Sequence, residues 1–180
     1  MVYILLAPGF EEAEALVPAD LLRRAGVEVA LVGTAGELVP GGQGITVKAD
    51  LELDQVDLST AEMLVLPGGG VGVANLGNDP KVEALVKEAA RRGIWLAAIC
   101  AAPSLLAKWD LLEGRNAVCY PTWTDRLPGA VLTDAPVVVD GPFITARAAG
   151  ASFDFGLKLA EVLTTAEKSQ EVRHGVYYRG

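Results

Sequence analysis

Short apolar runs alternate with helical patterns along most of the chain. Four runs are almost wholly apolar, at residues 2–7, 27–32, 63–66 and 94–99. Strands buried on both faces of a parallel sheet have this composition, whereas strands with one wet face alternate apolar and polar residues. The pattern therefore predicts four strands in the interior of a parallel sheet.

The segments between these runs carry the signals of helices. Residues 11–26 place acids first, bases last and a glycine at the end, the charge order that a helix dipole favours. Pro18 within this segment predicts a kink or a local break, because proline removes one helical hydrogen bond. Residues 80–92 keep the apolar spacing of a helix, with Asp79 suited to the N-cap and Pro80 to the first helical position. Both segments are predicted helices.

Shorter elements complete the chain. Residues 38–47 predict a small hairpin at the sheet edge, and a strand is expected near residues 117–120. Residues 137–145 predict a tight hairpin. A short helix should follow residue 100, and Ser152 and Thr165 are predicted to cap two final helices.

Alternating strands and helices predict an α/β fold with an open, mostly parallel sheet and helices on both faces. The chain of 180 residues is long enough for one well-buried domain and short for two. It contains no repeat and no linker. We therefore expect a single domain over residues 1–180.

Composition narrows the classes of partner. The net charge of −8 argues against nucleic acid or an anionic membrane as the main partner. No apolar run approaches the ~20 residues that a membrane helix needs. The first run has no basic leader and meets Pro8-Gly9 at once, which predicts a strand rather than a signal peptide. We therefore expect a cytoplasmic protein.

The few cysteines and the one histidine limit metal and disulfide chemistry. Two cysteines, Cys100 and Cys119, do not make a disulfide framework in a reducing compartment. His174 is the sole histidine, so a multi-histidine metal site is excluded, and no Cys/His cluster has zinc spacing. We expect no metal in the site.

Cys100 stands where a predicted strand passes into a helical pattern. Ala98 and Ala102, two residues to either side, are small, as a sharp strand-to-helix turn around a nucleophile requires. The N-terminal end of the following helix favours a thiolate. The alternative for Cys100 is a buried thiol that packs as a small apolar group.

Three predicted strands bring distinctive residues to one edge of the sheet. The first strand ends before an acidic segment at residues 11–14, the third ends in Gly68, Gly69 and Gly70, and the fourth ends in Cys100. In open α/β sheets the reactive crevice lies outside the carboxyl ends of the strands. Without a Cβ, Gly69 can bring its N–H close to a substrate oxygen, and with the N–H of Ala101 it would form an oxyanion hole. No G-K-[ST] follows the glycines, so this is not a phosphate-binding P-loop.

These residues carry a resemblance. The segments G-F-E-E-A-E, P-G-G-G, A-I-C-A-A-P and T-A-R-A-A-G-A-S-F-D-F-G resemble, in order and spacing, the ThiJ/PfpI superfamily. Within it the chain is most similar to the branch of the human parkinsonism-associated deglycase and bacterial YajL. The resemblance implies a flavodoxin-like three-layer sandwich, a homodimer, and a reactive cysteine beside a protonated glutamate. Carried over, these are Cys100 and Glu14, with Gly69 and Ala101 at the oxyanion-hole positions.

The physical reason for a protonated Glu14 is its effect on the sulfur. An ionised carboxylate beside Cys100 would raise the thiol pKa, whereas a protonated one can donate a hydrogen bond to the thiolate. Burial and the crowding of acids at residues 11–14 both favour keeping one proton. We therefore expect Cys100 to be ionised at neutral pH in dependence on Glu14. The alternative for any one of these acids is a solvated helix face.

One departure from the family bears on the reaction. Tyr120 stands where the human relative has a histidine, and His174 lies in the predicted last helix. A cysteine peptidase needs a base that also protonates the amine leaving group, so peptidase and glutamine-amidotransferase activities are disfavoured. Gly68, Tyr120 and Arg147 are candidate lining residues of the pocket, with surface roles as the alternative for the last two.

Addition of a thiolate to an aldehyde has no leaving group to expel. The resemblance implies a cofactor-free enzyme of glyoxalase or deglycase type, acting on methylglyoxal-like 2-oxoaldehydes or their protein adducts. The alternative is a redox sensor or holdase chaperone in which Cys100 is oxidised to a sulfinate. For Cys119 a buried, inert thiol is preferred over a resolving partner of Cys100.

Overall fold

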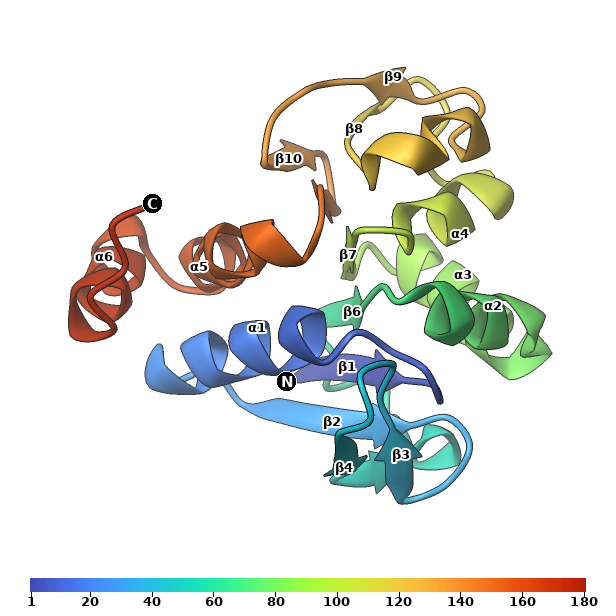
Figure 1. Cartoon of the computed structure of the whole chain (residues 1–180), viewed down its shortest axis with the longest axis horizontal. Coiled ribbons are helices and arrows are strands. Elements are labelled where there is room, and N and C mark those ends of the chain that lie inside the picture. The colour runs from blue at the N-terminus through green and yellow to red at the C-terminus, as the bar shows by residue number, and fades with distance from the viewer.

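The computed structural model describes all 180 residues, and one seven-stranded sheet runs through its middle (Figure 1). From one edge to the other its strands are β10 (Val137–Asp140), β11 (Phe143–Ala146), β7 (Trp95–Ile99), β6 (Met63–Leu66), β1 (Val2–Leu6), β2 (Val29–Gly33) and β5 (Leu51–Glu52). All neighbours are parallel except β10 and β11, which form the predicted hairpin. The four long apolar runs of the sequence form β1, β2, β6 and β7, which are parallel strands in the interior of the sheet.

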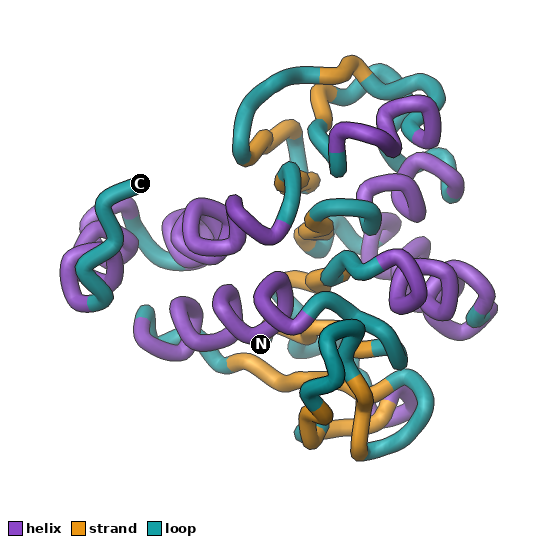
Figure 2. The backbone as a smooth tube through the Cα atoms, viewed as in Figure 1, coloured by secondary structure: helices purple, strands orange, loops and turns teal.

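Helices cover both faces of this sheet, so the three-layer α/β prediction is confirmed (Figures 1 and 2). One face carries α1 (Glu12–Arg24), α5 (Ser152–Leu163) and α6 (Ala166–Gly175). The other carries α2 (Gly70–Asn78), α3 (Pro80–Arg91) and α4 (Pro103–Lys108). None of the helices combines the length and the apolar character that crossing a membrane would require.

The core divides into two halves because side chains alternate across each strand. In β1, Tyr3 and Leu5 pack with the α2, α3 and α4 layer. Val2, Ile4 and Leu6 pack with the α1, α5 and α6 layer. Every residue of β1 is buried, which is why its sequence is apolar without a break.

The strand order reverses direction between β1 and β6. From β1 the chain moves to β2 on one side, and from β6 it moves to β7 and then β11 on the other. Such a switch point leaves a crevice at the carboxyl ends of the two strands, because their following loops diverge. The loops after β1, β6 and β7 therefore meet at one edge.

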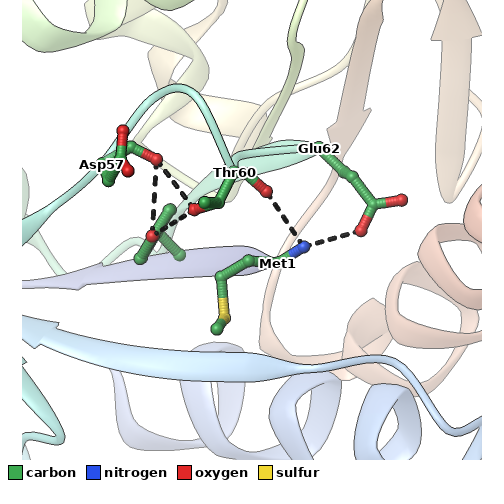
Figure 3. Close-up of polar contacts among 5 residues, drawn as sticks. Met1, Asp57, Thr60 and Glu62 are labelled. Atoms are coloured by element: carbon green, nitrogen blue, oxygen red, sulfur yellow. Dashed lines mark hydrogen bonds and ion pairs between the residues drawn. The ribbon is translucent and has the colours of Figure 1, made fainter.

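Polar contacts at the first residue hold β1 against the segment before β6 (Figure 3). The Met1 amino group forms an ion pair with Glu62 at 2.6 Å and donates to the Thr60 carbonyl at 3.2 Å. The Tyr3 hydroxyl lies 2.9 Å from Thr60 Oγ1. These contacts support the register in which Val2 pairs with Met63.

The predicted hairpin near the sheet edge is confirmed as β3 (Leu38–Pro40) and β4 (Thr46–Lys48), which pair with each other. Its turn is held by α1, because Glu12 Oε1 accepts hydrogen bonds from the Gln43 and Ile45 backbone N–H groups at 2.8 and 3.2 Å. Glu12 is thus a buried acid with a structural role.

The local break expected at Pro18 and the strand expected near residues 117–120 are wrong. α1 continues through Pro18 without a break, and Pro18 is buried against α5, where Gly156 leaves room for its Cα. The strand near residues 117–120 is only β8 (Asn116–Ala117), which pairs with β9 (Val131–Leu132) outside the main sheet. Pro121 begins a short 3-10 helix, so the extended segment ends early. Cys119 therefore lies in a loop and not on a neighbouring strand.

The predicted helix caps have mixed outcomes. Asp79 and Thr165 are N-caps whose side chains accept from the backbone N–H groups of Lys81 and Lys168. Ser152 is wrong as a cap: it is the first residue of α5, and its buried hydroxyl has no partner. The short 3-10 turn at residues 149–151 starts the helix without a side-chain cap.

Candidate active site

Cys100 lies on a strained turn directly after β7. Its φ is +65°, a conformation that residues other than glycine seldom adopt. Ala98 and Ala102 are fully buried at either side, and the Cys100 N–H donates to the Ala146 carbonyl at 2.9 Å. The predicted sharp turn is present, and it leaves the Cys100 side chain half-buried rather than enclosed.

Glu14 reaches the same point from the first turn of α1. Its side chain is 1% exposed, and Oε2 accepts the Gly68 backbone N–H at 2.8 Å. Oε1 is buried with no nitrogen or oxygen partner. The carboxyl and the Cys100 thiol lie close enough that each shifts the pKa of the other. Glu14 and Cys100 therefore form a buried acid–thiol pair.

Gly68 is packed between the two reactive groups. A Cβ at this position would overlap Glu14 Oε2 and would lie 2.7 Å from Cys100 Cβ. Only glycine allows the carboxyl and the sulfur to approach each other here. Gly68 thus lies between the two groups, and its backbone N–H supplies one of the hydrogen bonds to Glu14.

Gly69 and Ala101 supply two backbone N–H groups toward the sulfur. Both lower the pKa of the Cys100 thiol, and neither N–H donates to a backbone acceptor. Gly69 adopts φ +87°, and a side chain there would meet the backbone of the loop after β1. Donors arranged in this way stabilise negative charge that develops beside a nucleophile.

Burial decides the ionisation of the pair. It raises the pKa of Glu14 from 4.5 to about 7, against the lowering effect of the hydrogen bonds from Cys100 and Gly68. Burial and the charge of an ionised Glu14 raise the pKa of Cys100 to about 12. The pair therefore loses one proton near neutral pH and the second only in strong alkali. The first proton leaves the Glu14 carboxyl, so near neutral pH Cys100 is a thiol beside a carboxylate, and the expectation of an ionised Cys100 is not met.

The crowding of acids contributes less than expected. Glu11 raises the pKa of Glu14 by its charge, but this is the smallest of the causes, and burial is the largest. Glu12, the third acid, is turned toward the hairpin of β3 and β4. Among the three acids, Glu14 alone contacts the thiol.

Tyr120 and Arg147 are adjacent to the pair without placing their polar groups in it. The Tyr120 N–H donates to the Cys100 carbonyl at 2.7 Å, while its side chain is 42% exposed. Arg147 follows β11, the strand beside β7, and its guanidinium binds Asp134 at 2.7 Å. The backbone of Tyr120 supports the turn, and the charge of Arg147 is already paired.

The remaining cysteine and the histidine lie apart from the pair. His174 is exposed on α6, which packs on α5 at the outer edge of the molecule (Figure 1). Cys119 is buried, and burial raises the pKa of its thiol to about 11. No imidazole is therefore available to Cys100. No group of three or more His, Cys, Asp or Glu side chains is placed to hold a metal ion.

Sequence reasoning missed one contributor to the site, Gly9. Its carbonyl accepts the Gly72 N–H at 3.1 Å, and the Glu11 N–H donates to the Gly68 carbonyl at 3.0 Å. These bonds tie the loop after β1 to the loop after β6. The signal was a glycine directly after a buried strand, where φ is +84°.

Comparison with known proteins agrees with this geometry. The model of the DJ-1/PfpI family matches residues 1–162. The chain belongs to the DJ-1/PfpI family. The family resemblance of the sequence is thus confirmed, and the acid–thiol pair lies within the matched residues.

Relatives in this family match over nearly the whole chain. Protein dj-1beta of Drosophila melanogaster is 39% identical over 176 residues, which cover 96% of this chain and 94% of that protein. The crystal structure of Drosophila DJ-1beta has a TM-score of 0.94 at 38% identity and covers 99% of this chain and 98% of its own. The Caenorhabditis elegans glutathione-independent glyoxalase DJR-1.2 is 32% identical over 172 residues, 94% of this chain and 91% of that protein. Oxidized Toxoplasma gondii DJ-1 has a TM-score of 0.94 at 32% identity, covering 99% and 98% of the two chains.

Proposed function

We propose that this protein is a cofactor-free cysteine enzyme of glyoxalase type, which converts methylglyoxal-like 2-oxoaldehydes to hydroxy acids. One observation carries the proposal: a buried carboxyl and a half-buried thiol share a site with two unengaged backbone N–H groups. The naming of a similar protein as a glutathione-independent glyoxalase supports the same class. Protein adducts of these aldehydes belong to the proposal as a second kind of substrate.

The first step is addition of the thiol to the aldehyde carbon. The sulfur of Cys100 forms a bond to that carbon, and the proton of the pair passes to the aldehyde oxygen, which gives a hemithioacetal. The N–H groups of Gly69 and Ala101 stabilise the charge that develops on this oxygen. Because the pair holds one proton near neutral pH, the same proton serves the attack and the capture of the oxyanion.

The second step moves a proton between neighbouring carbons. Glu14, with its pKa raised to about 7 by burial, removes the proton from the former aldehyde carbon and returns one to the adjacent carbon. The product is the thioester of a hydroxy acid on Cys100. Water then breaks the carbon–sulfur bond, and lactate leaves when methylglyoxal is the substrate. No electrons leave the system, because one carbon is oxidised as its neighbour is reduced.

The test is lactate formation from methylglyoxal without added glutathione. Wild type should produce lactate catalytically, and Cys100→Ser should produce none above the uncatalysed rate. Cys119→Ser is the matched control, because it removes the other thiol and should retain activity. Equal lactate formation by wild type and Cys100→Ser would overturn the proposal.

A second candidate is a redox sensor in which Cys100 is oxidised to a sulfinate. The observation that favours it is the same pair of N–H groups, which can bind sulfinate oxygens, together with an oxidized form of a similar DJ-1 protein. Wild type that makes no lactate but takes up two oxygen atoms on Cys100 with peroxide would favour this function.

A further inference from the structure

A cavity of about 270 Å³, whose lining does not include Cys100, lies between α2, α4 and the 3-10 helix Pro121–Arg126. Figure 1 shows α4 between α2 and this turn. Its apolar walls are Val73, Ala74, Leu105 and the half-buried Trp123. Lys108 and Arg126 line it as well, and no acidic side chain does.

The charges of these two residues are unusual for this chain. Twelve of the fifteen lysines and arginines form ion pairs, and the exceptions are Lys108, Arg126 and Arg179. Two of the three unpaired cations therefore line the same cavity, in a chain of net charge −8.

The local contacts orient both cations without neutralising them. Lys108 Nζ donates to the Gly77 carbonyl at 2.9 Å, which holds it between α4 and α2. The Arg126 guanidinium lies 4.0 Å from the centre of the Trp123 ring. Stacking of this kind leaves the N–H edge of the guanidinium free to bind an anion. Glu83 acts on Lys108 by its charge but is already paired with Lys87 at 2.6 Å.

We propose that this cavity binds a small aromatic carboxylate. Arg126 and Lys108 would bind the carboxylate, and the aromatic body would lie against Trp123, Leu105 and Val73. The volume is just below the range of roughly 300–1,000 Å³ that is usual for drug-sized ligands, so a compact ligand of one or two rings fits. Apolar walls with a few placed charges are typical of such sites.

The proposal stands apart from the reaction at Cys100. Two hydrogen bonds connect the cavity walls to the site: the Val73 N–H donates to the Gly69 carbonyl at 2.8 Å, and Ser104 Oγ donates to the Ala101 carbonyl at 2.7 Å. Cys100 itself does not line the cavity. Binding can therefore be measured in a Cys100→Ser variant, and its result does not depend on the outcome of the lactate assay.

The experiment titrates ¹⁵N-labelled protein with 2-naphthoate and follows the indole N–H signals. The chain has three tryptophans, so a Trp123→Phe variant assigns the signal of Trp123 by its disappearance. Naphthoate should shift the Trp123 signal in a saturable manner, and neutral 2-naphthamide should bind at least tenfold more weakly. Added salt should weaken the binding of naphthoate only.

Charge-removing variants decide between this site and unspecific attraction. Arg126→Gln and Lys108→Gln should each weaken naphthoate binding about tenfold, and either suffices if the other fails to fold. Arg179→Gln is the matched control, because it removes the third unpaired cation outside the cavity and should leave the affinity unchanged. Equal affinity for naphthoate and naphthamide, or equal affinity in all variants, would overturn the proposal.

Discussion

Cys100 and Cys119 lie close together in the chain, yet their surroundings give them opposite character. Cys100 sits on a left-handed turn beside a carboxyl and two backbone N–H groups. Cys119 is 2% exposed, and its thiol donates only to the Tyr120 carbonyl at 3.3 Å. Burial raises the pKa of both thiols, so burial does not distinguish them. The difference in reactivity comes from the groups around each sulfur. Only Cys100 has a partner that can take its proton.

The largest expected effect is the difference in alkylation of the two thiols. At pH 8, iodoacetamide should modify Cys100 about 10³-fold faster than Cys119, because Cys119 reacts only after local opening that costs about 4 kcal/mol. The Cys100 rate should rise through about pH 7, where the pair loses its first proton, and then level off. Peptide mass spectrometry measures both rates in one sample. Similar alkylation rates for Cys100 and Cys119 would contradict this difference in reactivity.

The second prediction compares two buried acids on α1. Glu14→Gln should lower lactate formation about 10²-fold, since an amide cannot move the proton between carbons. Glu12→Gln is the matched control: the amide oxygen still accepts the two N–H groups of the hairpin turn. Its activity should stay within about twofold of wild type. Comparable losses in both variants would show that the acids act through the fold rather than through the thiol.

The third prediction concerns the space between the two groups of the pair. Gly68→Ala should cost about 2 kcal/mol in the free energy of unfolding, because the new methyl group overlaps Glu14 and Cys100. Gly70→Ala, two residues on, meets no atom within 4 Å and should be neutral or stabilising. Urea denaturation measures both. Equal stability of the two variants would contradict the packing described for Gly68.

The smallest effect is the dependence of stability on pH. The folded state raises the pKa of Glu14 from 4.5 to about 7, so it holds a proton that the unfolded chain has released. The contribution of this proton to the free energy of unfolding is therefore fully present below about pH 4.5 and is lost as pH rises through about 7. Between about pH 6 and pH 7 the free energy of unfolding should fall by about 1 kcal/mol. Glu14→Gln should remove this decline, and a decline that persists in that variant would assign it to another group.

The central fold, and the meeting of the acids at residues 11–14 with Cys100, were open to prediction from the sequence for a physical reason, whereas Glu14 was selected among those acids by the family resemblance. Strands buried on both faces are apolar without a break, and the residues after them must meet at one sheet edge. The helix α2 was missed because its sequence, from Gly70 to Asn78, holds three glycines and two asparagines. Its stability comes from Val73 and Leu76, which are buried in the core. Local helix propensity does not include such core contacts, so it could not predict α2.

Other errors have the same origin in tertiary structure. Pro18 is tolerated within α1 because α5 packs on it through a glycine. β5, with two residues, is fixed by pairing with β2 and has too short an apolar pattern to be found. The raised pKa of the Cys100 thiol was not expected either, since the degree of burial of both members of the pair is a property of the packed core.

The switch in strand order has a consequence for how this protein acquires its chemistry. Glu14 belongs to the first βα unit, whereas Gly68 and Cys100 belong to the units that begin at β6, and 54 positions separate Glu14 from the Gly68 N–H that it binds. Neither half of the chain contains a working pair. A nascent or fragmented chain therefore carries an ordinary thiol, and the pH-dependent reactivity of Cys100 reports that the two halves have docked. Two separately expressed fragments, cut between α1 and β6, should recover that reactivity only when mixed.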